Sequence, residues 1–140
     1  MIFISLMTHS QTNCGDLIYV TPTGNPVGVG TAGDPVDLNR ALQLVDPTRH
    51  HVLMLNGVYT YSQKFVLPSE TVLDGGYEIT GGEWVKNSSM TTTLNIAAPL
   101  ESPSAGIGNH IAIQLDGVND VYIKDITLVN TTNALSLIHI

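Results

Sequence analysis

Residues 111–129, IAIQLDGVNDVYIKDITLV, decide the fold, because aliphatic and polar residues alternate there in three short segments. These segments are 111–115, 121–124 and 126–129. Alternation over so few residues is typical of strands that bury one face. Asp116-Gly117 and Asp125 mark bends between the segments, and these corners lack the paired left-handed residues that a two-residue hairpin prefers. A chain that bends repeatedly while its aliphatic side stays inward indicates one coil of a parallel β-helix.

The predicted fold class is therefore all-β, a right-handed parallel β-helix (solenoid) with one short N-terminal capping α-helix. A repeat is indicated by Leu53, Leu73, Leu94 and Ile113, which are separated by 20, 21 and 19 residues. At about 20–25 residues per coil, the chain has room for roughly three to four coils and a cap.

The helix is predicted at residues 35–45. Its apolar residues fall at i, i+3, i+4 and i+7, namely Leu38, Ala41, Leu42 and Val45. Asp34-Pro35 has the composition of an N-cap followed by a first helical residue, and Asp46-Pro47 stops the pattern. A single amphipathic helix ahead of a coil stack would cover the first coil.

The other predicted strands have short apolar or alternating runs bounded by turn residues. They are 17–21, 52–55, 58–60, 65–67, 71–73 and 92–96. Pro22 is expected to end the first strand, Gly75-Gly76 to form a corner with positive φ, and the segment around Trp84 to be an irregular excursion. The residues predicted to face inward are Val52, Leu55, Leu67, Val72, Leu94, Ile96, Ile113, Leu115, Val121, Ile123, Ile126 and Leu128.

Four segments follow from these patterns. They are 1–16, a leader or disordered segment; 17–51, the first strand, a glycine-rich loop and the capping helix; 52–134, the first coils of a parallel β-helix; and 135–140, an artefactual tail. The opening MIFISLM is apolar but lacks the positive region of a signal peptide. The closing LSLIHI breaks the coil pattern and resembles translated sequencing adapter, so we expect a fragment of a longer protein.

Charge is sparse and acidic, with 5 Lys and Arg against 12 Asp and Glu and a net charge of −7. The cations are scattered, which excludes a nucleic-acid-binding surface. No apolar run reaches the roughly 20 residues of a membrane-spanning helix. Cys14 is the only cysteine, so neither a disulfide framework nor a cysteine zinc site is predicted.

A formal G-x-G-x-x-G occurs at Gly28, Gly30 and Gly33, after a strand and before a helix. In a dinucleotide site the helix begins within the glycines, whereas here it would begin after Asp34. The next strand ends at Asn56, where the fingerprint requires Asp or Glu. A flexible loop is the favoured interpretation, and no cofactor is predicted.

Acidic residues near the C-terminus are candidates for metal binding and catalysis. Asp116, Asp120 and Asp125 could hold calcium, and the adjoining Lys124 could act as a base on a uronate substrate. The alternative, which we favour, is that two of these carboxylates serve turns and that Lys124 and Asp125 face solvent. Asp74 with Asp116 could form a glycosidase pair, but Asp74 lies in a turn-like D-G-G sequence. No catalytic, cofactor-binding or metal-binding residue is predicted.

Aromatic residues, a histidine pair and two asparagines are candidates for sugar binding, metal binding and glycosylation. Candidate sugar-stacking aromatics are Tyr59, Tyr61, Tyr77 and Trp84, with a role in covering a cap as the alternative. His50-His51 lacks metal-ligand spacing and is interpreted as a pair of loop histidines. Asn87 and Asn130 begin glycosylation sequons, which matter only in a eukaryotic source.

Several sequence segments occur in an order that resembles that of a known protein family. They are IYVTPTG (18–24), DPVDLNRALQL (34–44), VLMLNGVYT (52–60), KFVLPSETVLDGGYE (64–78), EWVKN (83–87) and TTTLN (91–95). Over residues 17–130 the chain resembles the N-terminal part of secreted bacterial parallel β-helix proteins of the pectin-lyase-like superfamily, of the adhesin or surface type. That superfamily mixes lyases, hydrolases, adhesins and binding modules.

The resemblance implies an extracellular or cell-surface protein whose N-terminal part presents a surface for adhesion or carbohydrate binding, with no chemistry in this piece. The alternative is the N-terminal part of a polysaccharide lyase or glycoside hydrolase whose active groove lies on later coils. The expected partner is a polysaccharide or glycan. Self-association through an uncapped C-terminal coil is also expected, because open strand edges pair readily.

Overall fold

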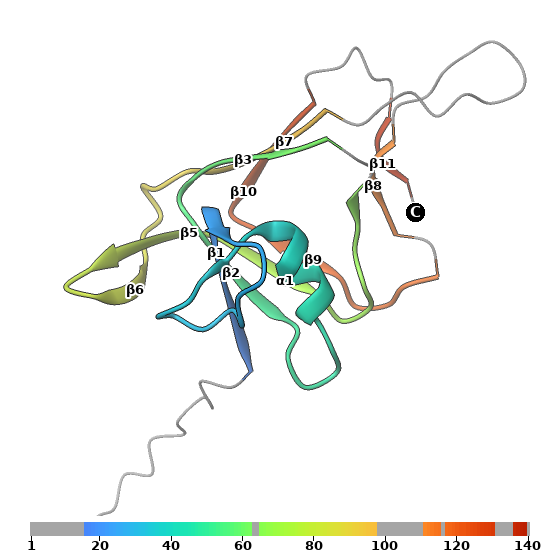
Figure 1. Cartoon of the computed structure of the whole chain (residues 1–140). Coiled ribbons are helices and arrows are strands. Elements are labelled where there is room, and N and C mark those ends of the chain that lie inside the picture. The colour runs from blue at the N-terminus through green and yellow to red at the C-terminus, as the bar shows by residue number, and fades with distance from the viewer. Residues whose placement is uncertain (1–15, 63–64, 98–110, 116, 131–135, 140) are drawn as a thin grey trace, which may run out of the picture.

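The computed structural model describes residues 16–62, 65–97, 111–115, 117–130 and 136–139 (Figure 1). The described residues form one short helix and eleven strands, so the all-β class is confirmed. In chain order the elements are β1 Leu17–Asn25, α1 Leu38–Leu44, β2 His51–Leu55, β3 Gly57–Tyr61, β4 Phe65–Val66, β5 Val72–Thr80, β6 Glu83–Lys86, β7 Thr92–Ile96, β8 Ile111–Gln114, β9 Tyr122–Lys124, β10 Ile126–Asn130 and β11 Ser136–His139.

The strands form three sheets. The first has the order β1-β2-β5-β6, with β9 also paired to β5; the second is β10-β7-β3, and the third is β11-β8-β4. Among the described strands every pairing is parallel except that of β5 with β6, which makes the first sheet mixed. The three segments predicted in residues 111–129 are strands β8, β9 and β10, and each belongs to a different sheet.

The core lies between the sheets. In the first sheet the register aligns Ile18, Val52, Leu73 and Ile123, and the first three of these are fully buried. The second sheet contributes Tyr59, Leu94 and Ile96, and the third contributes Ile113. Helix α1 packs on β1 and adds Leu38 and Ala41 to the same core.

The predicted helix began too early. Asp37, not Asp34, is the N-cap, and its carboxylate accepts a hydrogen bond of 2.7 Å from the backbone N–H of Arg40. Asp34 instead accepts from the backbone of Val29 and the side chain of Asn25, at 3.1 and 3.0 Å, and so closes the glycine loop. The first strand was predicted to end at Pro22 but extends to Asn25, because an edge strand tolerates a residue without an N–H.

The repeat spacing was misinterpreted. Leu73 lies opposite Val52 rather than Leu53, while Leu94 and Ile113 belong to the second and third sheets. The four residues therefore do not occupy equivalent positions. Since strands of all three sheets carry inward apolar residues, even spacing along the chain cannot distinguish strands of different sheets from strands that pair within one sheet.

Most of the predicted inward residues are in place. Those that are buried are Val52, Leu67, Leu94, Ile96 and Ile113; those that pack against the core while partly exposed are Leu115, Val121, Ile123, Ile126 and Leu128. Val72 and Leu55 were wrong, since Leu73 and Met54 beside them are the buried residues. An offset of one residue along a strand turns the side chain to the opposite face.

The excursion around Trp84 is regular rather than irregular. Strands β5 and β6 pair antiparallel from Tyr77 opposite Lys86 to Thr80 opposite Glu83, and the turn is made by Gly81 and Gly82, both at positive φ. Figure 1 shows this hairpin projecting from the rest of the protein. Asp74 and the two glycines after it continue β5 with a register shift instead of ending it, and Gly76 has the predicted positive φ of 73°.

The chain ends bear on the remaining predictions. Residues 1–15, including Cys14, lie outside the described residues. Residues 136–139 form strand β11, which pairs with β8. The prediction that residues 135–140 are an artefactual tail concerns their origin and not their conformation, so it stays a prediction. The other segment boundaries also stay predictions. Within the part of the chain that the structure describes, no helix is long and apolar enough to span a membrane.

Candidate functional site

The outer face of the first sheet gathers residues with binding potential. The register aligns Tyr19, Leu53, Asp74 and Lys124 on successive strands. Their neighbours along the strands point into the core, so this row points outward. Leu53 is only 6% exposed although it does not belong to the core, which means that apolar surface is buried on the outer face as well.

Aromatic rings from the hairpin lie beside this row. The Trp84 ring meets the Tyr19 ring edge-on, with centroids 5.0 Å apart, and the Tyr77 ring at 6.5 Å. The hairpin register puts Trp84 opposite Ile79, which is 52% exposed. We call Tyr19, Leu53, Asp74, Tyr77, Trp84 and Lys86 the outer-face patch.

The charges of the patch are tightly paired. The Lys86 Nζ lies 2.5 Å from Asp74 Oδ1, 2.7 Å from Asp125 Oδ2 and 2.5 Å from the carbonyl oxygen of Gly75. It also lies 5.0 Å from the centroid of the Tyr77 ring, and the Tyr77 hydroxyl donates a 3.0 Å hydrogen bond to Asp74 Oδ2. The β5–β6 hairpin thus places Lys86 in contact with two carboxylates, that of Asp74 in β5 and that of Asp125 at the corner between β9 and β10.

The pKa values follow from these contacts. Burial acts to raise the pKa of Asp74, but hydrogen bonds from Lys86 and Tyr77 outweigh it and hold that pKa below its ordinary value. Burial acts to lower the pKa of Lys86, and the bonds to Asp125 and Asp74 reverse this and raise it. Burial, followed by the charge of Asp74, raises the pKa of Tyr77 to about 12. At neutral pH the ionised Asp74 therefore faces a Lys86 cation.

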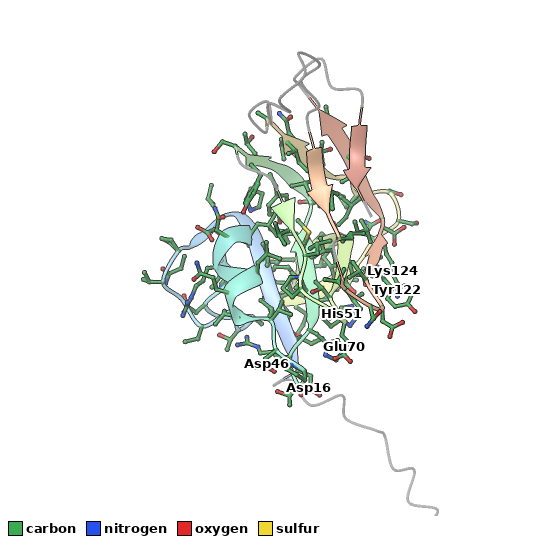
Figure 2. The ribbon with its side chains drawn as sticks, turned by 90° about the vertical axis from the view of Figure 1, so that its right-hand side faces the viewer. Asp16, Asp46, His51, Glu70, Tyr122 and Lys124 are labelled. Carbon is green, nitrogen blue, oxygen red and sulfur yellow. The ribbon has the colours of Figure 1, made fainter. Side chains whose placement is uncertain are left out.

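His51 borders the patch. Its Nε2 is buried without a hydrogen-bond partner and lies 3.5 Å from Asp74 Oδ2. It opens strand β2, so its interpretation as a loop residue was wrong. Figure 2 shows His51, Tyr122 and Lys124 on one side of the molecule, and the Lys124 Nζ lies 5.9 Å from the centroid of the Tyr122 ring.

The acidic residues weighed for catalysis are only partly brought together. Asp74 and Asp125 meet at Lys86, whereas Asp120 is exposed and separate, and Asp116 lies outside the described residues. Both Asp120 and Asp125 adopt positive φ, at 55° and 51°, as expected for acidic residues at corners. No group of three potential metal-binding side chains occurs among the described residues.

The aromatic candidates separate into two pairs. Tyr77 and Trp84 lie on the patch, but Tyr59 is 4% exposed, with its hydroxyl 3.0 Å from the carbonyl oxygen of Val20 and 2.9 Å from that of Leu55. Burial raises the pKa of Tyr59, and the ring cannot stack on a sugar. Tyr61 lines a cavity of about 180 Å³ together with Asp37, away from the patch.

The glycine loop and the sequons have structural partners. The Arg49 guanidinium donates to the carbonyl oxygens of Leu17 and Gly30, at 3.1 and 2.8 Å, and so ties the loop to β1. Helix α1 begins well after Gly33, so the glycines do not open a helix as a dinucleotide site requires. Asn87 donates to Glu78 at 2.8 Å, and the side chain of Asn130 lies outside the described residues.

Sequence reasoning missed Tyr19, Leu53 and Lys86. A basic and an aromatic residue at alternate positions of a short strand, Trp84 and Lys86, were the available sign, together with the Gly81-Gly82 turn. No pattern in the sequence indicates that Lys86 contacts Asp74 and Asp125, because these residues are remote from one another in sequence.

Comparison with known proteins gives one partial likeness. Over 61 residues, or 44% of this chain, the sequence is 42% identical to "Pectate lyase L" of Thermoclostridium stercorarium, and the match covers 5% of that protein. No family model and no solved structure matches the chain. The likeness to a pectate lyase is confined to this stretch, and the chain spans only a small part of the length of that protein.

Proposed function

We propose that this chain is the N-terminal part of an extracellular right-handed parallel β-helix and that its outer-face patch binds polysaccharide. The observation that carries the proposal is the cluster of Tyr19, Tyr77 and Trp84 beside paired polar groups on one outer face.

The strand order supports a β-helix. After α1 the chain visits the first, second and third sheets with β2, β3 and β4, and again with β5, β7 and β8, and a third time with β9, β10 and β11. Three sheets visited in rotation, with parallel pairing apart from β5 with β6, are what a coiled chain produces, and crossovers between parallel strands are nearly always right-handed. Strand β6 is then an insertion in the second coil, where it forms a hairpin with β5. Helix α1, packed on β1, acts as the cap.

The patch has the chemistry of a glycan site. Aromatic rings offer flat apolar faces to the C–H surface of a pyranose, while carboxylates accept hydrogen bonds from its hydroxyls. Asp74 retains acceptor capacity beside its bonds to Lys86 and Tyr77. The His51 Nε2 lies 3.5 Å from Asp74 Oδ2 and borders this carboxylate on a further side.

Affinity electrophoresis and calorimetry on neutral plant glycans, polygalacturonate and alginate test the proposal. We expect binding to at least one polymer, weakened about tenfold or more by Trp84→Ala. Val85→Ala is the matched control, because Val85 adjoins Trp84 but faces the other side of the hairpin. Absence of binding to every polymer, or equal losses in the two variants with unchanged melting temperatures, would refute the role of the patch.

A second candidate is supported by the 61-residue likeness to a pectate lyase. In that case the full-length protein is a polysaccharide lyase or glycoside hydrolase, and its active groove lies on coils beyond this piece. We expect this chain alone to release no unsaturated uronate from polygalacturonate, with or without calcium. Turnover that disappears in Asp116→Ala or Lys124→Ala would overturn that expectation and place chemistry here.

A further inference from the structure

We propose that the outer-face patch selects an uncharged glycan and discriminates against polyuronates, because the protein's own carboxylates already saturate its cation. The inference rests on the proposed function and names the ligand class of the same site.

The saturation of Lys86 is a matter of counting donors. A lysine ammonium has three N–H donors and no acceptor. Three oxygens surround Nζ, one each from Asp74, Asp125 and the carbonyl of Gly75, at 2.5–2.7 Å. No donor remains for the carboxylate of a uronate, which would have to displace one of these oxygens.

Among the residues that the structure describes, few other cations can replace Lys86. Arg40 and Arg49 are held in the N-terminal loop region by backbone carbonyls, Arg40 by that of Gly28 and Arg49 by those of Leu17 and Gly30. Within the patch the charges of Asp74 and Lys86 sum to zero, and so do those of Asp125 and Lys124 beside it, where Lys124 contacts the Tyr122 ring. On a chain with a net charge of −7, a neutral patch offers a polyanion no compensating attraction.

The groups still open to a ligand suit hydroxyls. The remaining lone pairs of Asp74 can accept a hydrogen bond from a sugar hydroxyl, whereas an ionised uronate carboxylate cannot donate one and would be repelled. The faces of the aromatic rings around Trp84 carry a negative quadrupole, so they offer no attraction to a carboxylate at C6. The balance of these terms favours a neutral sugar ring.

A charge-matched pair of variants tests this. Asp125→Asn removes one of the two carboxylates from Lys86, and Asp120→Asn removes an equal charge at a second exposed corner that does not bind Lys86. Both residues have positive φ, a conformation that asparagine adopts readily, so the fold should tolerate both changes.

The probes are polygalacturonate, the same polymer after carboxyl reduction, and a neutral β-glucan, each titrated with a chelator and with calcium. The first two probes differ only in the replacement of each carboxylate by a neutral CH₂OH group. We expect the unmodified chain to bind a neutral probe at least about tenfold more tightly than polygalacturonate. Asp125→Asn should strengthen polygalacturonate binding about threefold or more at low salt, an effect that added salt removes, and Asp120→Asn should not.

The outcomes that contradict the inference are distinct from those that contradict the proposed function. Equal or tighter binding of polygalacturonate by the unmodified chain, in chelator or only with calcium, overturns the inference while the proposed function stands. An identical response to Asp125→Asn and Asp120→Asn also overturns it, because Lys86 would then not be the determinant. Failure to bind any of the three probes, or binding unaffected by Trp84→Ala, defeats the proposed function itself.

Discussion

Replacing Gly75 by alanine should destabilise the protein, because this glycine of β5 lies in close contact with strands β7 and β10 of the second sheet. A Cβ at this position would lie 2.5 Å from the backbone oxygen of Asp125, 2.8 Å from Thr92 Cβ and 2.9 Å from Ile126 Cγ1. These neighbours cannot move freely. Asp125 forms the corner before β10, and the Thr92 hydroxyl accepts a 2.8 Å hydrogen bond from the backbone N–H of Gly76.

The magnitude follows from two opposing terms. Inserting a methyl group into a closely packed site costs typically about 1–3 kcal/mol. Alanine also restricts the unfolded chain, which stabilises the fold by about 0.4–1 kcal/mol. The expected net loss is about 1–2 kcal/mol, or roughly 3–8 °C in melting temperature for a chain of this size. Since Gly75 does not have positive φ, the loss is steric rather than conformational.

Thermal and urea unfolding followed by circular dichroism measure the loss, and Gly33→Ala serves as the control. A Cβ at Gly33 would meet nothing within 4 Å, so this substitution should be neutral or slightly stabilising. If Gly75→Ala melted at or above the temperature of the unmodified chain, the close approach of β5 to the Asp125 corner would be refuted.

Three further predictions concern the core, the ion pair and the open edges. Leu73→Ala should cost about 2–5 kcal/mol in urea unfolding and Val72→Ala clearly less; equal losses would contradict the assignment of the strand faces. Asp74→Asn should lower the melting temperature most near neutral pH. Because the folded pKa of Asp74 is depressed, its contribution is present above the unfolded pKa and is lost as pH falls through the folded value, so a pH-independent difference would contradict the pairing with Lys86. Strands β9, β10 and β11 each pair on one side only among the described strands, so light scattering should show self-association that increases with concentration, and a concentration-independent monomer would speak against it.

What the sequence determined by itself is local. Alternating residues in 111–129 and in Thr92–Ile96 predicted strands at nearly their observed bounds, and the helical spacing of Leu38 and Ala41 predicted α1. The sparse, scattered cations predict that the chain has no nucleic-acid surface, and this stays a prediction. These properties need no distant partner, because the period of side-chain orientation is set by neighbouring residues along the backbone.

What only the tertiary structure decided depends on pairing between distant segments. The even leucine spacing suggested the wrong equivalences, and the sequence favoured Val72 over Leu73, since an apolar run fits either face until its partner strand fixes the register. The outer-face patch was invisible for the same reason. Asp74 lies in β5, and Asp125 lies far along the chain between β9 and β10. Lys86 contacts both carboxylates only because β6 folds back along β5, and no local sequence pattern encodes this packing.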